Sequence, residues 1–455
     1  MKRVVLLILV CFLSLENSAQ TEGTSTIRIL TFEEAVKIAL KNSVILNQQK
    51  NTLEYNQINR TSNYLGLGPS LSFSSSAVQI DGNTFNQQQG KVVNGIFDQV
   101  TGSFNANLNL FNGFGQINKA KQASNQLDGQ AYYVNRASQD VINSVAAAYL
   151  LVLLDTELLK IAYENYEALK KQLEQVTEQV NLGAKSPVDK YNQDSQTKAA
   201  EIKALQAEIS LINDRSALTL ILLQDPSEEF NVVKPTWDVN KSSIEGVDLK
   251  QLFEISNRSR GDLLRAQKNE EAAKYGMRSS RAAMTPTLSA FATLYSAFNN
   301  PHGDPSVRPF TDQFQNDNLR KFYGLQFNLP IFGGNQTFQY RTTYIQQKVA
   351  YNNSVLTRKN VEYQVKTDIV KAYQNFKLYS KTYSVSIEQL DAAKKAYDLE
   401  TERYNLGITN FVDFSNANKT FVQSQADKAQ AEYRLLFQKV LVDYAAGTLK
   451  PEDFQ

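Results

Sequence analysis

The sequence predicts a mixed α/β membrane protein in which one order of elements occurs twice: a helix, two strands and a long helical hairpin. Three observations lead to this fold class. The same landmarks recur about 220 residues apart, four segments alternate between apolar and polar residues, and two segments of about seventy residues carry almost no proline or glycine. Each repeat is therefore expected to be one structural unit.

The composition limits the chemistry that the chain can perform. The 455 residues include 48 Lys and Arg against 46 Asp and Glu, and this net charge of +2 is too balanced for a protein that coats nucleic acid. One His and one Cys exclude a zinc site built from several such ligands. The composition leaves carboxylate chemistry and oxygen-ligated metals possible. From the whole pattern of the sequence we expect no enzyme activity, no cofactor, no metal and no nucleic-acid partner. The mean hydropathy of −0.39 argues against a bundle of transmembrane helices, whereas strands of a membrane barrel are only half apolar.

The first residues have the pattern of a secretory signal peptide over 1–19. A short basic start precedes an unbroken apolar run at 4–13, and cleavage is expected after Ala19. The run is too short for an ordinary membrane-spanning helix. Cys11 lies inside the run and follows Val10, where a lipid-attachment signal needs a small residue, so a lipoprotein anchor is not expected. Removal of 1–19 removes the only cysteine, and the mature chain is expected to contain no disulfide.

Four landmarks occur twice in the same order along the chain. The offset between the two copies stays between 217 and 224 residues, which indicates a duplication. The most similar copies share the residues Asn-Leu-Gly followed by an aspartate six positions after the glycine. The pairs are 31–36 with 248–253, 68–72 with 285–289, 110–113 with 331–334, and 181–189 with 405–413.

Each repeat begins with a predicted helix and continues with two predicted strands. In the first repeat, apolar residues at helical spacing over 31–63 end just before Gly66 and Pro69, where a helix should stop. Alternating apolar and polar residues then predict strands, and stretches rich in Asn, Gln, Gly and Asp predict loops. The predicted strands lie at about 70–80, 101–111, 287–298 and 322–332, and the predicted loops lie at 81–100 and 299–320.

The alternation places large apolar side chains on one face of these strands. Asn and Gln recur on the other face, which fits strands with lipid on one side and water on the other. A strand of an ordinary β-sandwich with one solvent-exposed face has the same pattern. Because an unpaired strand edge is not tolerated in lipid, four predicted strands cannot form a membrane barrel without further chains. The predicted lipid-facing residues are Phe104, Leu108, Leu110, Leu325, Phe327 and Leu329.

Two predicted helices are far longer than those of a globular domain. The segments 114–181 and 336–405 contain no proline, and apolar residues and tyrosines recur three and four residues apart in a coiled-coil-like stripe. At ~1.5 Å per residue, roughly seventy residues make a rod of about 100 Å. Such a helix is long enough to cross a cellular compartment.

A repeated turn signal ends each long helix. Gly183 and Gly407 stand where a glycine with left-handed backbone conformation closes a helix, and Ser186 is placed to cap the helix that follows. Helices returning over about 187–223 and 411–446 would complete two helical hairpins, with their tips at 181–189 and 405–413.

These features divide the chain into a signal peptide, two repeats and two short segments. The segment between the repeats contains the single Trp237 and is predicted to form a belt around the helices. The predicted boundaries are 1–19 for the signal peptide, 20–223 for the first repeat, 224–247 for the linker, 248–447 for the second repeat and 448–455 for the tail.

The arrangement of these elements, the paired tips and the segment 329–334 resemble the TolC-like outer-membrane efflux family over about residues 28–447. The resemblance implies a homotrimer in which three chains form one twelve-stranded barrel in the outer membrane of a Gram-negative cell. Their helices would form a tunnel through the periplasm. It also implies two partners, a periplasmic adaptor protein and an inner-membrane pump of the RND or ABC type.

The resemblance also implies functional residues near the tips. Tyr404 matches a gate tyrosine of the family, whereas Thr409 stands at the position of its partner arginine, so that contact is expected to be absent or replaced. Asp413 matches one position of an acidic ring that narrows the pore, and Asn416 stands at the other, which lowers the expected charge. The residues expected to contact the adaptor are Leu182, Gly183, Leu406 and Gly407.

Two other functions fit parts of the sequence. A secreted trimeric stalk or adhesin would account for the long helices, but it gives no reason for a pair of alternating strands in each repeat. An enzyme that uses carboxylate chemistry is supported only by scattered Asp and Glu residues on helix faces. The efflux channel is the function that accounts for the whole pattern.

Overall fold

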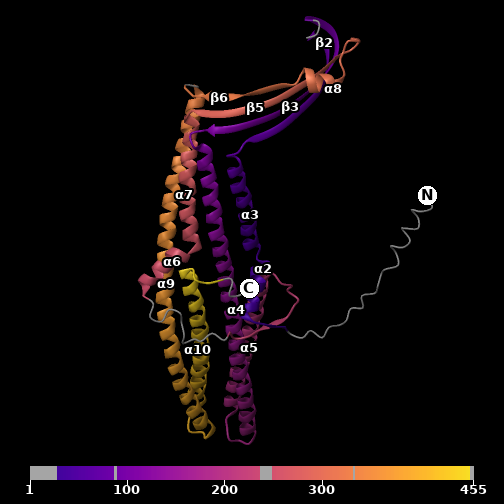
Figure 1. Ribbon diagram of the computed structural model, residues 1–455. Coiled ribbons are helices and arrows are strands. Elements are labelled where there is room, and N and C mark those ends of the chain that lie inside the picture. Colours follow the sequence, from indigo (N-terminus) through magenta and orange to yellow (C-terminus); the bar gives the residue numbers. More distant parts are fainter. Residues whose placement is uncertain (1–27, 87–89, 236–247, 332–333, 451–455) are drawn as a thin grey trace, which may run out of the picture.

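The computed structural model describes residues 28–86, 90–235, 248–331 and 334–450. The predicted signal peptide at 1–19 and Trp237 lie outside these residues. The described chain forms a long row of helices with a curved four-stranded sheet at one end and two helical tips at the other (Figure 1).

The first repeat starts with a kinked pair of helices rather than the single predicted helix over 31–63. The break at Ser43 was not predicted, and it arises because the Ser43 hydroxyl accepts a hydrogen bond from the Leu46 N–H and caps a second helix. The elements of this repeat are α2 (Phe32–Asn42), α3 (Val44–Leu65), β2 (Ser70–Asn86), β3 (Lys91–Phe111), α4 (Gly115–Asn181) and α5 (Pro187–Leu222).

The second repeat has the same order, and its first helix is also broken, at Arg260. Its elements are α6 (Leu249–Ser259), α7 (Gly261–Arg281), β5 (Thr287–Pro301), β6 (Arg320–Asn328), α9 (Asn335–Asn405) and α10 (Phe411–Ala446). Two three-residue strands, β1 (Arg28–Leu30) and β4 (Phe230–Val232), pair in parallel and tie the start of the described chain to the segment between the repeats.

The strands of the first repeat are longer than predicted, and the loop prediction for 81–100 was wrong. β2 and β3 pair without interruption from Ser70 opposite Asn107 to Asn86 opposite Lys91. Polar residues there pair across the strands, as in the hydrogen bond from Gln79 Nε2 to Asp98 Oδ1 at 2.8 Å. Strand pairing is non-local and outweighs the polar composition that predicts a loop.

The strands of the second repeat end differently from the prediction. β5 extends to Pro301, and β6 ends at Asn328 rather than near 332, because Pro330 cannot donate to a strand ladder. Part of the predicted loop over 299–320 is helical, with α8 (Phe310–Asp312) and a π-helical turn at Gln313–Asp317. The Gln313 amide exchanges two hydrogen bonds of 3.1 Å with the backbone of Asn299 and so covers the edge of β5 beyond the end of β6.

The helices form one row whose members change halfway along the molecule. Near the sheet, the packing order is α3, α4, α7 and α9, and near the tips it is α5, α4, α10 and α9 (Figure 1). α4 and α9 therefore run through both halves, with 67 and 71 residues respectively. The four strands follow the order β2, β3, β5 and β6, so β2 and β6 are the two edges of the sheet.

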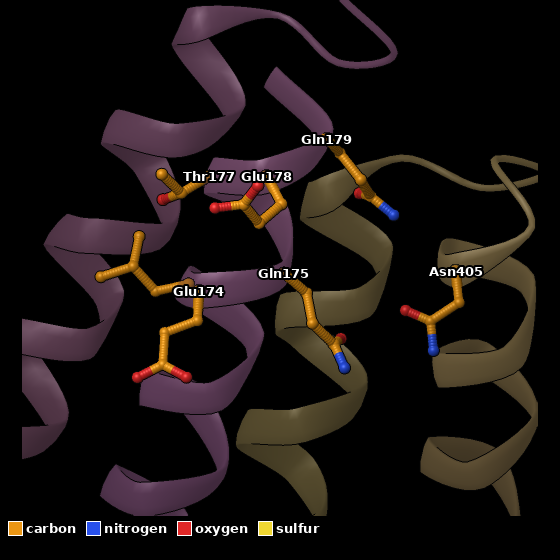
Figure 2. Close-up of a pocket in the computed structure, with 7 residues that line it drawn as sticks. Glu174, Gln175, Thr177, Glu178, Gln179 and Asn405 are labelled. Atoms are coloured by element: carbon orange, nitrogen blue, oxygen red, sulfur yellow. The ribbon is translucent and has the colours of Figure 1, made fainter. Parts of the chain in front are cut away.

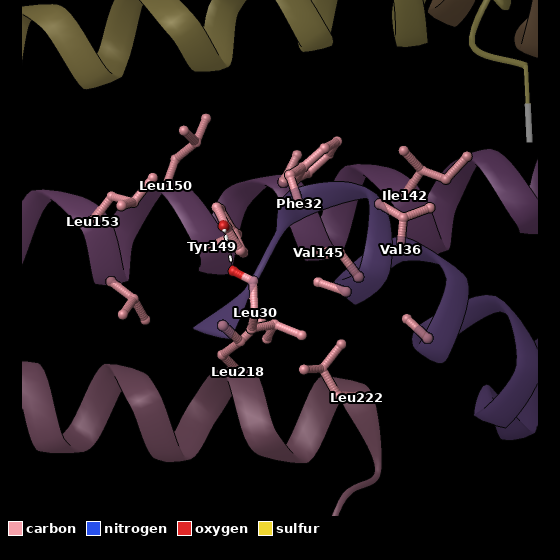
Figure 3. Close-up of a cluster of buried hydrophobic side chains, with 14 of the residues drawn as sticks. Leu30, Phe32, Val36, Ile142, Val145, Tyr149, Leu150, Leu153, Leu218 and Leu222 are labelled. Carbon is pink, nitrogen blue, oxygen red and sulfur yellow. Dashed lines mark hydrogen bonds between the residues drawn. The ribbon is translucent and has the colours of Figure 1, made fainter. Parts of the chain in front are cut away.

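The main core lies near the middle of the molecule, where α3 and α7 of the row are replaced by α5 and α10. Side chains of α2, α4 and α5 close around β1, as Figure 3 shows for Leu30, Phe32 and Tyr149. Tyr149 is fully buried, and its hydroxyl oxygen lies 2.8 Å from the Leu30 carbonyl and accepts a hydrogen bond from the Val233 N–H at 3.0 Å. This tyrosine joins the start of the described chain, the first long helix and the linker. A second, smaller core packs α6, α7, α9 and the end of α10.

Candidate functional site

The apolar face of the sheet continues across all four strands. Leu108 is opposite Ala290, and Ala290 is opposite Leu325, so these three side chains share one face. Phe104 shares it with Phe73 of β2 and Leu294 of β5. A continuous apolar surface of this kind is what contact with lipid requires.

Two of the predicted lipid-facing residues are not paired in the sheet. Leu110 falls at a register shift between Asn109 and Phe111. Leu329 lies beyond the end of β6, so its prediction as a strand position was wrong, and the reason is the nearby Pro330. Phe327 remains in the strand, opposite Leu288.

The opposite face of the sheet is polar and internally hydrogen-bonded. Ser74 and Ser103 lie 2.7 Å apart through their hydroxyl oxygens, and the Thr293 hydroxyl donates to Asn105 Oδ1 at 2.9 Å. Asn107 lies on the same face, opposite Ser70. Hydroxyls and amides can exchange these bonds with water, as the wall of an aqueous channel requires.

The two tips are tight turns that expose one leucine each. Gly183 and Gly407 have φ values of 77° and 73°, a left-handed conformation that strains any residue with a Cβ. The preceding Leu182 and Leu406 are 81% and 74% exposed. The turns therefore present apolar side chains at the end of the molecule, where the resemblance to the efflux family implies a contact with an adaptor.

The helices that return from the tips are capped by side chains. Ser186 and Asp189 form a reciprocal capping box at the start of α5. At the start of α10, the Asn410 side chain accepts from the Asp413 N–H at 3.0 Å, and its amide donates to Asp413 Oδ2 at 2.9 Å. Asp413 and Asn416 are exposed and three residues apart, so they share one face at the start of α10.

Tyr404 is buried within the second hairpin instead of projecting from it. Its side chain is 3% exposed, and its ring stacks on that of Phe414 with centroids 4.8 Å apart. Burial is the main cause that raises the pKa of the Tyr404 hydroxyl, and the charge of Asp189 adds to it. Thr409 stands at the position of the family's arginine and does not make the arginine's contact. Its hydroxyl instead donates to Asp413 Oδ2 at 3.3 Å.

Lys185 of the first tip is the residue that reaches Tyr404. Its Nζ lies 3.5 Å from the centroid of the tyrosine ring. Burial lowers the pKa of this lysine, although the charge of Asp189 acts in the opposite direction. The prediction from the sequence did not include Lys185, because the contact joins two residues 219 positions apart.

An open groove of about 1000 Å³ lies between the hairpins near the tips. Figure 2 shows Gln175 and Gln179 pointing from α4 toward the second hairpin, where Asn405 lies. The Gln172 amide also donates to Asn405 Oδ1 at 3.4 Å. Five of the seven side chains that line it end in an amide or a carboxylate.

Two further findings concern helices and metals. Within the part of the chain that the structure describes, no helix is long and apolar enough to cross a membrane. Among the same residues, no three His, Cys, Asp or Glu side chains lie close enough together to hold a metal ion.

Comparison with known proteins identifies relatives over most of the chain. The model of the family described as "Outer membrane efflux protein" matches residues 39–222 and 254–448. Outer membrane protein TolC of Escherichia coli (strain K12) is 23% identical over 326 residues, which are 69% of this chain and 63% of TolC, so the chain spans less than two thirds of that relative.

Solved structures share the fold along almost the whole chain. The crystal structure of the outer membrane protein VceC from Vibrio cholerae has a TM-score of 0.77 at 16% identity, over 91% of this chain and 96% of that one. The outer-membrane channel OprN has a TM-score of 0.77 at 15% identity, over 92% and 90%. These similarities show that this chain has the same fold, that is, the same arrangement of helices and strands, as the two solved structures.

Proposed function

Since the chain belongs to the outer membrane efflux protein family, we propose that it forms a trimeric channel and tunnel that exports small molecules or proteins. Membership of the family confirms the resemblance derived from the sequence. It also assigns the protein to the outer membrane and to transport rather than to an enzyme class. The trimer, the barrel, the partners and the substrates are parts of the proposal.

The observation that carries the proposal is the four-stranded sheet with one apolar face and two free edges. β2 and β6 each leave one row of backbone groups without a strand neighbour within the described chain. Unpaired backbone groups cost several kcal/mol each in hydrocarbon, on the order of the cost of burying an amide without a partner. Pairing β2 of one chain with β6 of the next would satisfy both edges, and three chains would close a barrel of twelve strands.

Exposed apolar stripes on the outer helices support the same assembly. α5 and α9 lie at opposite sides of the pair of hairpins, because α4 and α10 pack between them (Figure 1). Two different surfaces that fit each other produce a head-to-tail contact, which closes into a ring when the rotation allows it. The stripe on α5 contains Ile202, Leu205, Ile209 and Ile212, and that on α9 contains Leu356, Tyr363, Leu378, Val385 and Leu399.

The tips are the proposed entrance and the proposed contact with an adaptor protein. Leu182 and Leu406 are exposed, and the turns at Gly183 and Gly407 fix their direction. The proposed gate contains Tyr404, Asp413 and Asn416. An inner-membrane pump of the RND or ABC type would deliver the substrate to this end.

Purified protein in detergent tests the assembly and the channel together. We expect a trimer by light scattering and stepwise conductance in planar bilayers. A monodisperse monomer that retains its strand signal would contradict the barrel, and a trimer without conductance would favour a helical stalk.

A further inference from the structure

One charged side chain lies on the polar face of the four-stranded sheet. Residues that are directly opposite on neighbouring strands share a face, and Arg320 of β6 is in one row with Tyr295, Ser103 and Ser74. From this row to the helical end of β6, the other described residues of the polar face are uncharged. Among the described residues, the charge of this surface is therefore that of Arg320.

The guanidinium group of Arg320 is available to a ligand. The residue is exposed, and within the part of the chain that the structure describes no hydrogen bond or ion pair engages its side chain. The carboxylate of Asp317, three residues earlier, is held by Arg308 at 2.8 Å. In the proposed trimer, β6 would pair with β2 of the next chain, whose residues on this face between 70 and 76 are serines. Serine hydroxyls would leave the positive charge in place.

Aromatic side chains lie beside Arg320 on the same face. Phe322 is two residues farther along β6 and is 49% exposed, and Phe291 of β5 is 36% exposed. Phe291 is directly opposite Gly324, and a Cβ at Gly324 would lie 3.1 Å from its ring, so this ring extends over β6. The β5–β6 patch, formed by Arg320, Tyr295, Phe291 and Phe322, thus combines a cation with three aromatic side chains. On the same face, β2 and β3 contribute serine, threonine and asparagine.

Arg320 stands at the outer end of the proposed barrel. β6 begins at this residue and runs toward α9, so Arg320 is at the end of the strand away from the helices (Figure 1). At ~3.3 Å per residue, it is about 25 Å from Asn328 at the other end of the strand. Threefold assembly would bring three copies around the lumen, where like charges repel one another and favour a bound anion.

We propose that the β5–β6 patch binds cargo in the lumen of the barrel and favours small organic anions that carry an aromatic ring. The inference rests on the proposed channel function and adds a substrate class to it. The guanidinium group of an arginine binds a planar anion through two parallel hydrogen bonds, and exposed aromatic faces stack on a flat ring. Because the patch is exposed to water, its binding is weak enough to release the cargo, as conduction requires.

Current block in planar bilayers tests the patch in the full-length protein. The probes are naphthalenesulfonate, which has an anionic group and aromatic rings, and methanesulfonate, which has the anionic group alone. The wild type should be blocked by naphthalenesulfonate at the lower concentration. Arg320→Gln should raise that concentration by about fivefold or more and shift the reversal potential in a KCl gradient toward cation selectivity. Phe322→Leu should raise the blocking concentration of naphthalenesulfonate alone and leave the reversal potential unchanged.

The matched control is Lys321→Gln, which removes the same charge from the next residue of β6, on the opposite face of the sheet. It should leave both the block and the reversal potential unchanged. An unaltered reversal potential in Arg320→Gln, or an equal shift in Lys321→Gln, overturns the inference. Equal block of the wild type by the two probes, or unchanged block in Phe322→Leu, overturns the assignment of an aromatic cargo.

Binding of fluorescent naphthalenesulfonate to the purified protein in a non-ionic detergent separates failure of the inference from failure of the proposed function. If the wild-type protein does not conduct, the channel proposal fails, and binding that weakens in Arg320→Gln and Phe322→Leu but not in Lys321→Gln still supports the patch. If the wild type conducts and the three variants match it in block, binding and reversal potential, the channel stands and the patch is overturned.

Discussion

Leu108 of β3 and Leu325 of β6 lie on one face of the sheet, on either side of Ala290 of the strand between them. The two residues belong to different repeats, and their alternation patterns were found independently in the sequence. Strand pairing brings both patterns into a single apolar surface. Because a shift of one residue would turn every side chain to the other face, this agreement fixes the register.

Arginine on this face should hinder insertion into the membrane. Leu108→Arg or Phe327→Arg should destabilise the inserted protein by about 2–4 kcal/mol near the bilayer midplane, because the charge would face hydrocarbon. The matched variant Asn107→Arg, on the polar face, should have a much smaller effect. Urea unfolding from lipid vesicles measures these differences, and equal tolerance at both faces would refute the assigned faces.

Loss of the Tyr149 hydroxyl should weaken the attachment of β1 and the linker to α4. Tyr149→Phe leaves the buried Leu30 carbonyl and the Val233 N–H without this partner, so we expect a loss of about 1–3 kcal/mol. Denaturant unfolding in detergent measures the loss. Tyr163→Phe is the control, since that side chain is exposed and should be replaceable at almost no cost.

The stability of the first hairpin should fall as the pH rises from about 4 to about 7. Burial, together with the nearby Asp214, raises the pKa of Asp155 from 3.8 to about 7, so the folded chain holds this proton more firmly than the unfolded chain. The resulting stability is fully present below the unfolded pKa and is lost as the pH passes the folded one.

Asp155→Asn should remove this loss, because the amide stays neutral at every pH. The thermal midpoint of the variant should then change less between pH 5 and pH 8 than that of the wild type, and the variant should be the more stable protein at pH 8. Parallel pH profiles for the two proteins would show that Asp155 ionises normally.

Asp413 is expected to make the entrance selective for cations. In the proposed trimer, three copies around one axis would repel one another and attract cations from the periplasmic side. Asp413→Asn should reduce both cation selectivity and block by trivalent cations in planar bilayers. Asp189→Asn removes the corresponding charge from the first tip, and an equal change there would show that Asp413 acts only as a helix cap.

The helical hairpins were predictable because their signals are local. The glycine turns, the serine cap and the unbroken apolar stripes each depend on residues a few positions apart, and the structure has helix ends at those turns. The break at Ser43 was missed, since a serine within an apolar pattern is compatible with a continuous helix.

The sheet and the tip contact were less predictable because they depend on residues far apart in the chain. The polar half of the β2–β3 hairpin has a loop composition, and only pairing with a partner strand makes it regular. Lys185 has no distinctive neighbours in the sequence, and its contact with Tyr404 emerges only when the first tip lies against the second hairpin. Thr409 at the position of the family's arginine indicated that this contact is absent or replaced, but not where a replacement would lie.

Because α4 is one continuous helix, a rotation where it is packed in the main core is carried along it to the first tip. The helix is clamped near Tyr149 by the main core and continues without a break to Asn181 at the first tip. At ~1.5 Å per residue, the part of α4 between Tyr149 and the tip is about 50 Å long, so a rotation of about 5° at the core moves the tip by about 4 Å. A small change of angle at the core is therefore amplified into a displacement of several ångströms at the tip.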